Sequence, residues 1–297
     1  MRQDVFRGYH PLVNLLYFLL VLGCSMFVMH PVFLLCSLLG GLCYRGYLQK
    51  GKVLKTALQF MLPVFLVTAL VNPLFTHEGA TILSYFRSGN PLTLESILFG
   101  LGAGLMLVSV LNWFSCYQEV MTSDKFIYLF GRVIPAMSLV LSMVLRFVPK
   151  FKAQIEKVST AQKCIGRDVS NGSAPEKARH GMKILSIMTT WALENSVETA
   201  DSMKSRGYGL RGRTNYSLYR FDTRDTMMTA LMGLMALIVL VGLGTKTVHF
   251  LYYPVIRMNE STPFAVLVYV CYGALCLLPL CLNLIEDMKW QYLQSKI

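Results

Sequence analysis

The sequence predicts an all-α fold: a polytopic membrane protein with about six transmembrane helices and long amphipathic helices on the cytoplasmic side. Three observations predict it. Hydrophobic residues make up 54% of the 297 residues and charged residues only 15%, whereas about 25% of the residues of a soluble domain are charged. Apolar stretches that could cross a bilayer recur along the chain. The Lys and Arg residues gather between these stretches, above all in residues 119–226.

Six apolar stretches are candidate spans, because a helix needs about 20 residues to cross a hydrocarbon core about 30 Å thick. They are residues 12–29, 32–44, 58–75, 97–116, 227–244 and 264–284. The second is short and depends on the turn at His30-Pro31. The first lacks a small-residue cleavage site and is followed by further spans, so we expect it to be retained and not removed as a signal peptide.

The basic residues orient these spans. With the amino terminus inside, 25 of the 28 Lys and Arg residues lie in cytoplasmic segments, and only Arg87, Lys246 and Arg257 lie outside. The cytoplasmic segments are then residues 1–11, 45–57, 119–226 and 286–297. Because Lys and Arg favour the cytoplasmic ends of spans, we expect both termini to be cytoplasmic. This topology explains the net charge of +12 without a nucleic-acid partner.

Three regions follow from this topology. Residues 1–118 form N-terminal transmembrane helices, residues 119–226 a cytoplasmic region, and residues 227–297 C-terminal transmembrane helices. Gly100 and Gly104 form a GxxxG pattern in the fourth span, which we expect to allow a close helix contact within this chain. The eight cysteines include no CxxC pair, which indicates neither a disulfide framework nor a zinc site.

The start of the cytoplasmic region is the most ambiguous part of the chain. Thirteen uncharged residues separate Arg132 from Arg146, and as a helix they cover about 20 Å, less than the hydrocarbon core. We therefore expect one helix over residues 126–148, lying at the interface or beneath the other helices. A tilted span with snorkelling arginines is the alternative.

Two amphipathic helices follow. Phe147, Phe151, Ile155 and Val158 recur at helical spacing, and this helix is expected to end near Gly166. In the second helix the apolar face is predicted from Ile184, Ile187, Met188 and Trp191, and a solvated face from Glu194, Glu198 and Asp201. The glycines that are expected to end it are Gly207, Gly209 and Gly212. Two such helices between spans are typical of a docking platform.

Several motifs here resemble those of one family. The core is Ser205-Arg206-Gly207, which follows an amphipathic helix between spans. Further matches are Asn72-Pro73, Pro91-Leu-Thr-Leu-Glu95, the segment 157–168, and Arg224-Asp225. Together they cover most of residues 70–226. They resemble the transmembrane (T) component of energy-coupling factor (ECF) type ABC transporters, in the cobalt and vitamin uptake permease family.

The resemblance implies a non-catalytic scaffold with no cofactor, metal or substrate site of its own. Two ATP-binding cassette ATPases would bind its paired coupling helices in the cytoplasm. A small substrate-binding membrane subunit (S component) would bind its helical platform, for uptake of a vitamin or metal ion across the bacterial plasma membrane. ATP would bind elsewhere, because the chain contains no GxxxxGK[ST] pattern.

The resemblance also implies the contact residues. The second coupling tip would be Ser205, Arg206 and Gly207, because a guanidinium offers fixed donors to a carboxylate or to carbonyls in a groove. Capping of a helix end is the simpler alternative for Arg206. The first tip would comprise Lys163, Ile165, Gly166 and Arg167. Ile165 stands there where the family usually has Arg, so either Arg167 or Lys163 substitutes for it or the contact is mainly apolar. Apart from the resemblance, the amphipathic pattern predicts a partner surface of Phe151, Ile155, Val158 and Trp191, which is expected to bury against the ATPases or against the chain's own platform.

Two rival functions fit the sequence less well. A permease with its own substrate path needs buried charges or broken helices at mid-membrane depth, and an intramembrane enzyme needs paired carboxylates or clustered His and Cys. The six apolar stretches contain essentially neither.

Overall fold

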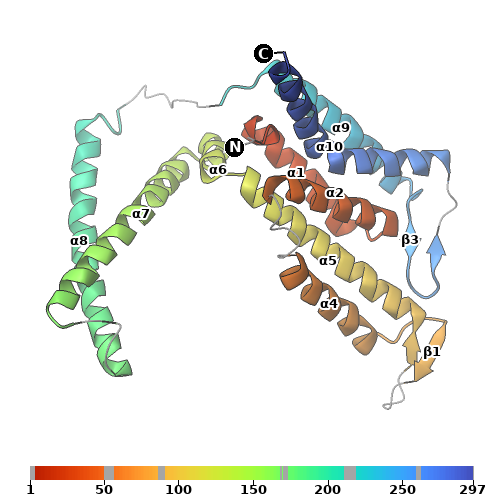
Figure 1. Cartoon of the computed structure of the whole chain (residues 1–297), viewed down its shortest axis with the longest axis horizontal. Helices are drawn as coiled ribbons and strands as arrows, with labels where there is room; N and C mark the ends of the chain where they lie inside the picture. The colour runs from red at the N-terminus through yellow and green to blue at the C-terminus, as the bar shows by residue number, and fades with distance from the viewer. Residues whose placement is uncertain are drawn as a thin grey trace. The chain divides into compact units, whose positions relative to one another are not determined.

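The protein is mostly helical (Figure 1). A computed structural model describes residues 4–49, 57–85, 91–167, 169, 173–210, 219–258 and 262–296. The chain divides into two compact units, one of Met1–Phe126 with Tyr219–Ile297 and the other of Ile127–Leu218. Each unit is described by itself below.

All six predicted apolar stretches are helical. They correspond to α1 (Pro11–Phe27), α2 (Pro31–Gln49), a π-helical turn (Ala57–Met61) with α4 (Leu62–Phe75), α5 (Leu94–Val120), α9 (Thr223–Gly244) and α10 (Pro263–Gln294). In the described part of the chain, α2, α5, α9 and α10 are long and apolar enough to span a membrane, whereas α1 and Gln59–Phe75 are shorter apolar helices. The predicted fold class, a polytopic helical membrane protein, is confirmed.

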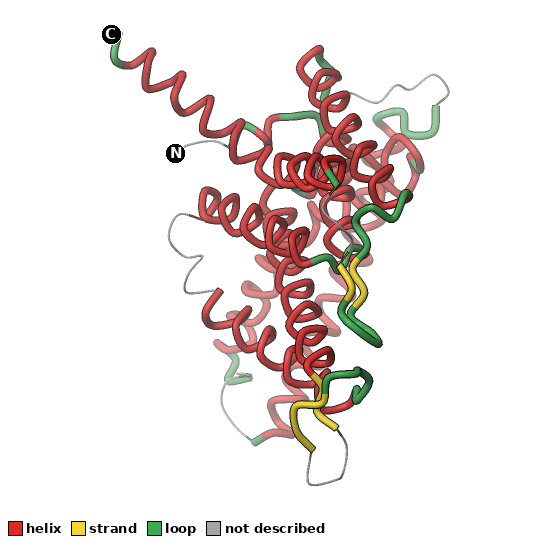
Figure 2. The backbone as a smooth tube through the Cα atoms, turned by 90° about the vertical axis from the view of Figure 1, so that its right-hand side faces the viewer, coloured by secondary structure: helices red, strands yellow, loops and turns green. Residues whose placement is uncertain are grey.

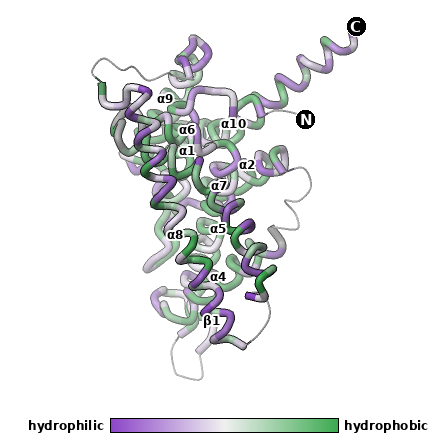
Figure 3. The backbone as a smooth tube through the Cα atoms, turned by 90° about the vertical axis from the view of Figure 1, so that its left-hand side faces the viewer, coloured by the Kyte–Doolittle hydropathy of each residue, from purple (hydrophilic) through white to green (hydrophobic). Residues whose placement is uncertain are grey.

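The last turns of α10 differ from the rest of that helix. The predicted span ends at residue 284, but the helix continues to Gln294 and carries Glu286, Asp287 and Lys289. Hydrophilic residues therefore alternate with hydrophobic ones toward the carboxyl terminus (Figure 3). Helical geometry persists beyond the apolar stretch because the backbone bonds are satisfied within the helix.

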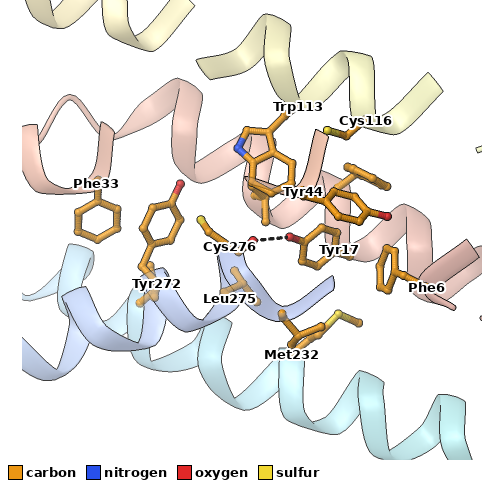
Figure 4. Close-up of a cluster of buried hydrophobic side chains, with 14 of the residues drawn as sticks. Phe6, Tyr17, Phe33, Tyr44, Trp113, Cys116, Met232, Tyr272, Leu275 and Cys276 are labelled. Atoms are coloured by element: carbon orange, nitrogen blue, oxygen red, sulfur yellow. Dashed lines mark hydrogen bonds between the residues drawn. The ribbon is translucent and has the colours of Figure 1, made fainter. Parts of the chain in front are cut away.

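The core of the first unit is rich in aromatic side chains (Figure 4). Tyr17 packs 6.0 Å from Trp113 between ring centroids and donates a hydrogen bond to the carbonyl of Cys276 at 3.4 Å. The hydroxyl groups of Ser25, Ser37 and Ser109 form a buried chain with 2.6 Å separations. These three hydroxyl groups thus satisfy one another's hydrogen bonding inside the core.

Two glycines hold α5 close to α4. A Cβ atom on Gly100 would lie 2.7 Å from the carbonyl oxygen of Ala69, and one on Gly104 would lie 2.9 Å from the Phe65 ring. Neither position can therefore hold a larger residue unless α4 moves. The prediction that this GxxxG pattern serves a contact within the chain is confirmed.

Two short antiparallel hairpins lie in the loops that were predicted to be external (Figure 2). One pairs β1 (Ile82–Tyr85) with β2 (Pro91–Thr93), and the other pairs β3 (Phe250–Leu251) with β4 (Arg257–Met258). Glu95 fastens the first hairpin to α5, because its carboxylate accepts hydrogen bonds from the backbone N–H and the hydroxyl of Thr81. The predicted external residue Arg87 lies outside the described residues.

The second unit contains most of α6 (Ser123–Val133), together with α7 (Pro135–Cys164) and α8 (Ala174–Ser205). The prediction of one helix over residues 126–148 is wrong. The chain leaves the helix at Ile134, whose φ of −133° and ψ of 84° are not helical, because the ring of Pro135 disfavours a helical residue before it. From Pro135 a single helix of 30 residues continues through Pro149 and joins two predicted segments.

Candidate coupling tips and partner surface

The first contact between α7 and α8 is aromatic. The rings of Phe151 and Trp191 meet edge to face with centroids 5.2 Å apart. The ammonium of Lys150 lies 5.6 Å from the centroid of the Trp191 ring and donates to Asn195 Oδ1 at 2.5 Å. Phe151 and Trp191, both predicted partner residues, are half-buried because they pack against each other.

A shallow apolar groove of about 710 Å³ follows α7. Its lining comprises Val144, Phe147, Val148, Phe151, Lys152, Ile155 and Glu156. Ile155 remains 46% exposed, and Val158, one turn further on, is half-buried. Of the four predicted partner-surface residues, Phe151 and Ile155 therefore line one groove, Trp191 supports it from α8, and Val158 lies beyond its end.

A second apolar face on α8 was missed. Met182, Leu185, Leu193 and Val197 are between 62% and 68% exposed, whereas the predicted apolar residue Met188 is buried. Their spacing of three, eight and four residues keeps them on one side of a helix. The gap between Leu185 and Leu193 is occupied there by Thr189, which hides the pattern in the sequence.

The first tip ends α7 in a Schellman turn. Gly166 adopts a left-handed conformation with φ of +78°, which glycine accepts without the strain of a side chain. Its N–H bonds to the carbonyl of Lys163 at 3.0 Å, and the N–H of Arg167 bonds to that of Gln162 at 2.9 Å. Ile165 is the capping residue, with φ of −92° and ψ of 10°.

The second tip ends α8 in the same turn. Gly207 has φ of +80°, its N–H bonds to the carbonyl of Lys204 at 3.0 Å, and the N–H of Tyr208 bonds to that of Met203 at 3.0 Å. Arg206 is the capping residue, with φ of −86° and ψ of 11°. The predicted terminator Gly212, by contrast, lies outside the described residues.

The backbones of the two tips correspond residue by residue, so Ile165 and Arg206 occupy the same position. Both side chains are exposed, and Ile165 is 67% exposed. Among the other predicted tip residues, Lys163, Gly166, Arg167 and Ser205 are also exposed and Gly207 is half-buried. All seven predicted tip residues therefore belong to two solvent-accessible turns of identical backbone.

One buried cation, Lys125, was also missed. It lies near the start of α6, is 3% exposed, and donates to the carbonyl of Arg7 at 2.5 Å. With the Asn14 amide turned so that its oxygen faces the ammonium, that oxygen accepts a second bond at 2.6 Å. Burial lowers the pKa of Lys125 to about 8. Lys125, Arg7 and Asn14 all belong to the first unit, so this contact lies within that unit.

Comparison with known proteins identifies the family. The family described as cobalt transport protein (CbiQ) matches residues 3–216, a stretch that ends before α9. The energy-coupling factor transporter transmembrane protein EcfT of Staphylococcus aureus is 25% identical over 189 residues, which are 60% of this chain and 70% of that protein. EcfT of Brevibacillus brevis is 24% identical over 238 residues, 75% of this chain and 89% of that protein.

A more similar relative aligns over a shorter stretch. EcfT of Exiguobacterium sibiricum is 36% identical over 107 residues, which are 36% of this chain and only 38% of that protein. The longer alignments and the family match agree with the helical membrane fold. The chain therefore belongs to the cobalt transport protein (CbiQ) family, as the non-catalytic transmembrane component of an energy-coupling factor transporter.

Proposed function

We propose that this transmembrane component binds two ATP-binding cassette ATPases through the tips of α7 and α8, and a separate substrate-binding membrane subunit through the apolar faces of the same helices. ATP-driven movement of the ATPases would then reach the substrate-binding subunit through these helices. The cargo would be a vitamin or a metal ion, and the family description names cobalt transport.

The observation that carries this proposal is the pair of matching exposed turns. Each turn ends a helix of 30 or 32 residues and carries two basic side chains: Lys163 and Arg167 in the first, Lys204 and Arg206 in the second. Cations at helix ends interact favourably with the helix dipole, but exposed cations on two copies of one turn also suit acidic or carbonyl-lined grooves on partner proteins.

The proposed topology puts these tips in the cytoplasm. Residues 119–226, the proposed coupling region, carry 17 of the 28 basic residues, and the positive-inside tendency therefore favours a cytoplasmic location for this region and for both termini. ATP is available on that side of a bacterial plasma membrane. The orientation and the role of the tips thus support each other.

The partner surface supports a membrane-bound partner. Five of the seven side chains that line the groove on α7 are apolar, and α8 exposes four more apolar side chains. Neighbouring exposed apolar side chains with polar residues around them are typical of a site that binds a protein or a membrane. We propose that the groove around Phe151 and Ile155, supported by Trp191 and extended by Val158, receives the substrate-binding subunit.

Exchange of Ile155 for Asp tests this surface. Because Ile155 is 46% exposed, the change should leave the chain folded but should put a charge into the proposed apolar interface, at a cost of at least about 2 kcal/mol. Co-purification of the substrate-binding subunit is expected to fall about tenfold or more while both ATPases remain bound. Ala153→Asp is the matched control, since residue 153 lies about 160° away around the helix. Equal losses in the two variants, or none in either, would remove the groove from the proposal.

A further inference from the structure

The two tips share a backbone but exchange the chemistry of two positions. At the capping position the first tip has Ile165 and the second has Arg206. Two residues later the first tip has Arg167 and the second has Tyr208, whose N–H groups make the equivalent hydrogen bonds. Each tip therefore keeps one arginine and one large, mainly apolar side chain, in opposite places.

The third position of the turn follows the same exchange. This is the residue whose carbonyl accepts the Schellman bond from five residues further along the chain, and it is Gln162 in the first tip and Met203 in the second. Both are half-buried, whereas the capping residues are exposed. In the first tip the apolar capping residue Ile165 thus has polar residues three before and two after it. In the second tip the cationic capping residue Arg206 has mainly apolar residues at those two positions.

We infer that the first tip docks with Ile165 as an apolar plug, in an ATPase groove that lacks the acceptor for Arg206 and has an apolar floor at that point. This inference rests on the proposed function, because it names the chemistry of a partner that the proposal requires. On this inference the two tips are not interchangeable, because each binds a groove of different chemistry. Two ATPases with identical grooves would therefore not match both tips.

The physical reason is the cost of mismatch. A groove that receives Arg206 presents carboxylate or carbonyl oxygens, and covering them with Ile would leave those acceptors buried and unpaired. Conversely, an arginine pressed into an apolar groove loses its hydration without gaining a counter-charge. Because the two turns have the same backbone hydrogen bonds and nearly the same φ and ψ, a difference in shape does not distinguish the tips. The side chains at the capping position would therefore decide which groove each tip fits.

The test uses the capping positions in a chain whose second tip has been weakened. The complete chain, in nanodiscs, is titrated with the ATPase subunits that co-purify with the unaltered protein. In an Arg206→Ala background, Ile165→Arg is expected to weaken ATPase binding by about tenfold or more, and Ile165→Val by less than about threefold. Because Ile165 is 67% exposed, neither change disturbs a packed core, and an unchanged thermal unfolding temperature checks this.

Two identical acidic grooves predict the reverse result. An arginine restored at position 165 would then find its acceptor, and Ile165→Arg would tighten binding and rescue Arg206→Ala. Rescue, or unaltered binding, would overturn the inference of an apolar groove. A different outcome identifies failure of the proposed function itself: if Arg206→Ala alone binds ATPases as well as the unaltered chain, the tips are not the coupling sites.

Discussion

Replacement of Arg206 by Ala separates a coupling role from a capping role. In the isolated chain Arg206 is exposed at the end of α8, and its guanidinium makes no hydrogen bond or ion pair with the residues that the structure describes. Its only general contribution to the chain is the interaction of a cation with the helix dipole, about 0.3–1 kcal/mol. The turn itself survives the change, since its hydrogen bonds are between backbone groups.

In the assembled transporter the expected cost is larger. Removal of an arginine from a desolvated pair leaves the acceptors of the partner buried without a counter-charge, which typically costs about 2–5 kcal/mol. Since 1.4 kcal/mol is a factor of ten, ATPase affinity should fall at least about thirtyfold. Arg206→Lys should recover only part of this, because an ammonium cannot reproduce the two parallel hydrogen bonds of a guanidinium.

The assay measures co-purified ATPase and substrate uptake for Arg206→Ala, Arg206→Lys and the unaltered chain. Coupling predicts Ala far below Lys, and Lys below Arg, in both measurements. Capping predicts that Lys serves as well as Arg and that Ala loses less than about 1 kcal/mol. Unaltered association and uptake for Arg206→Ala would refute the reasoning, and equal recovery by Lys would refute the bidentate contact.

Two further predictions concern topology and packing. In a cysteine-free background, a single cysteine at Arg257 should react with a membrane-impermeant maleimide from outside the cell, whereas one at Lys177 should react only after lysis; external labelling at 177 would reverse the proposed orientation. Gly100→Ala should destabilise the chain by about 1–3 kcal/mol, because its Cβ would lie 2.7 Å from the carbonyl oxygen of Ala69. Gly233→Ala, on α9 with open space around the added Cβ, is the control in a thermal-unfolding series; equal stability of the two variants would remove the close α4–α5 contact as the cause.

Hydrophobicity predicted the membrane helices well because the apolar stretch that is visible in the sequence is also what causes the helix to form. An apolar stretch of about 20 residues buries its backbone bonds in a helix whatever its neighbours do. The hairpins at β1–β2 and β3–β4 carry no such signal, since strands of two to four residues are too short to show alternation. They form because the flanking helices bring the two ends of each loop together.

Two prolines illustrate why the helices of the second unit were harder to predict. Pro135 follows a break, as residue rules expect, but Pro149 lies inside α7 without ending it. The bond that Pro149 cannot donate would go to Leu145, and both residues are exposed, so water can satisfy that carbonyl. Rules based on residue type predict a helix end at both prolines, whereas the solvent exposure around Pro149 allows the helix to continue there.

The two tips could be located from the sequence, but the similarity of their backbone conformations could not be predicted from it. A glycine after a helix indicates a left-handed turn, so Gly166 and Gly207 were evident from the residues alone. The correspondence of Ile165 with Arg206 as capping residues comes from φ, ψ and four backbone hydrogen bonds. The exposed face of α8 was hidden for a different reason, because Thr189 interrupts its apolar repeat.

The continuity of α7 gives the protein a lever arm. A helix of 30 residues is about 45 Å long, and this one helix carries both the apolar groove and the first tip. A rotation of about 10° about one end of such a helix moves the other end by about 8 Å, since the displacement scales with a length of about 1.5 Å per residue. In the proposed function, a small swing of an ATPase at the tip would therefore become a displacement larger than one helical turn at the far end of α7.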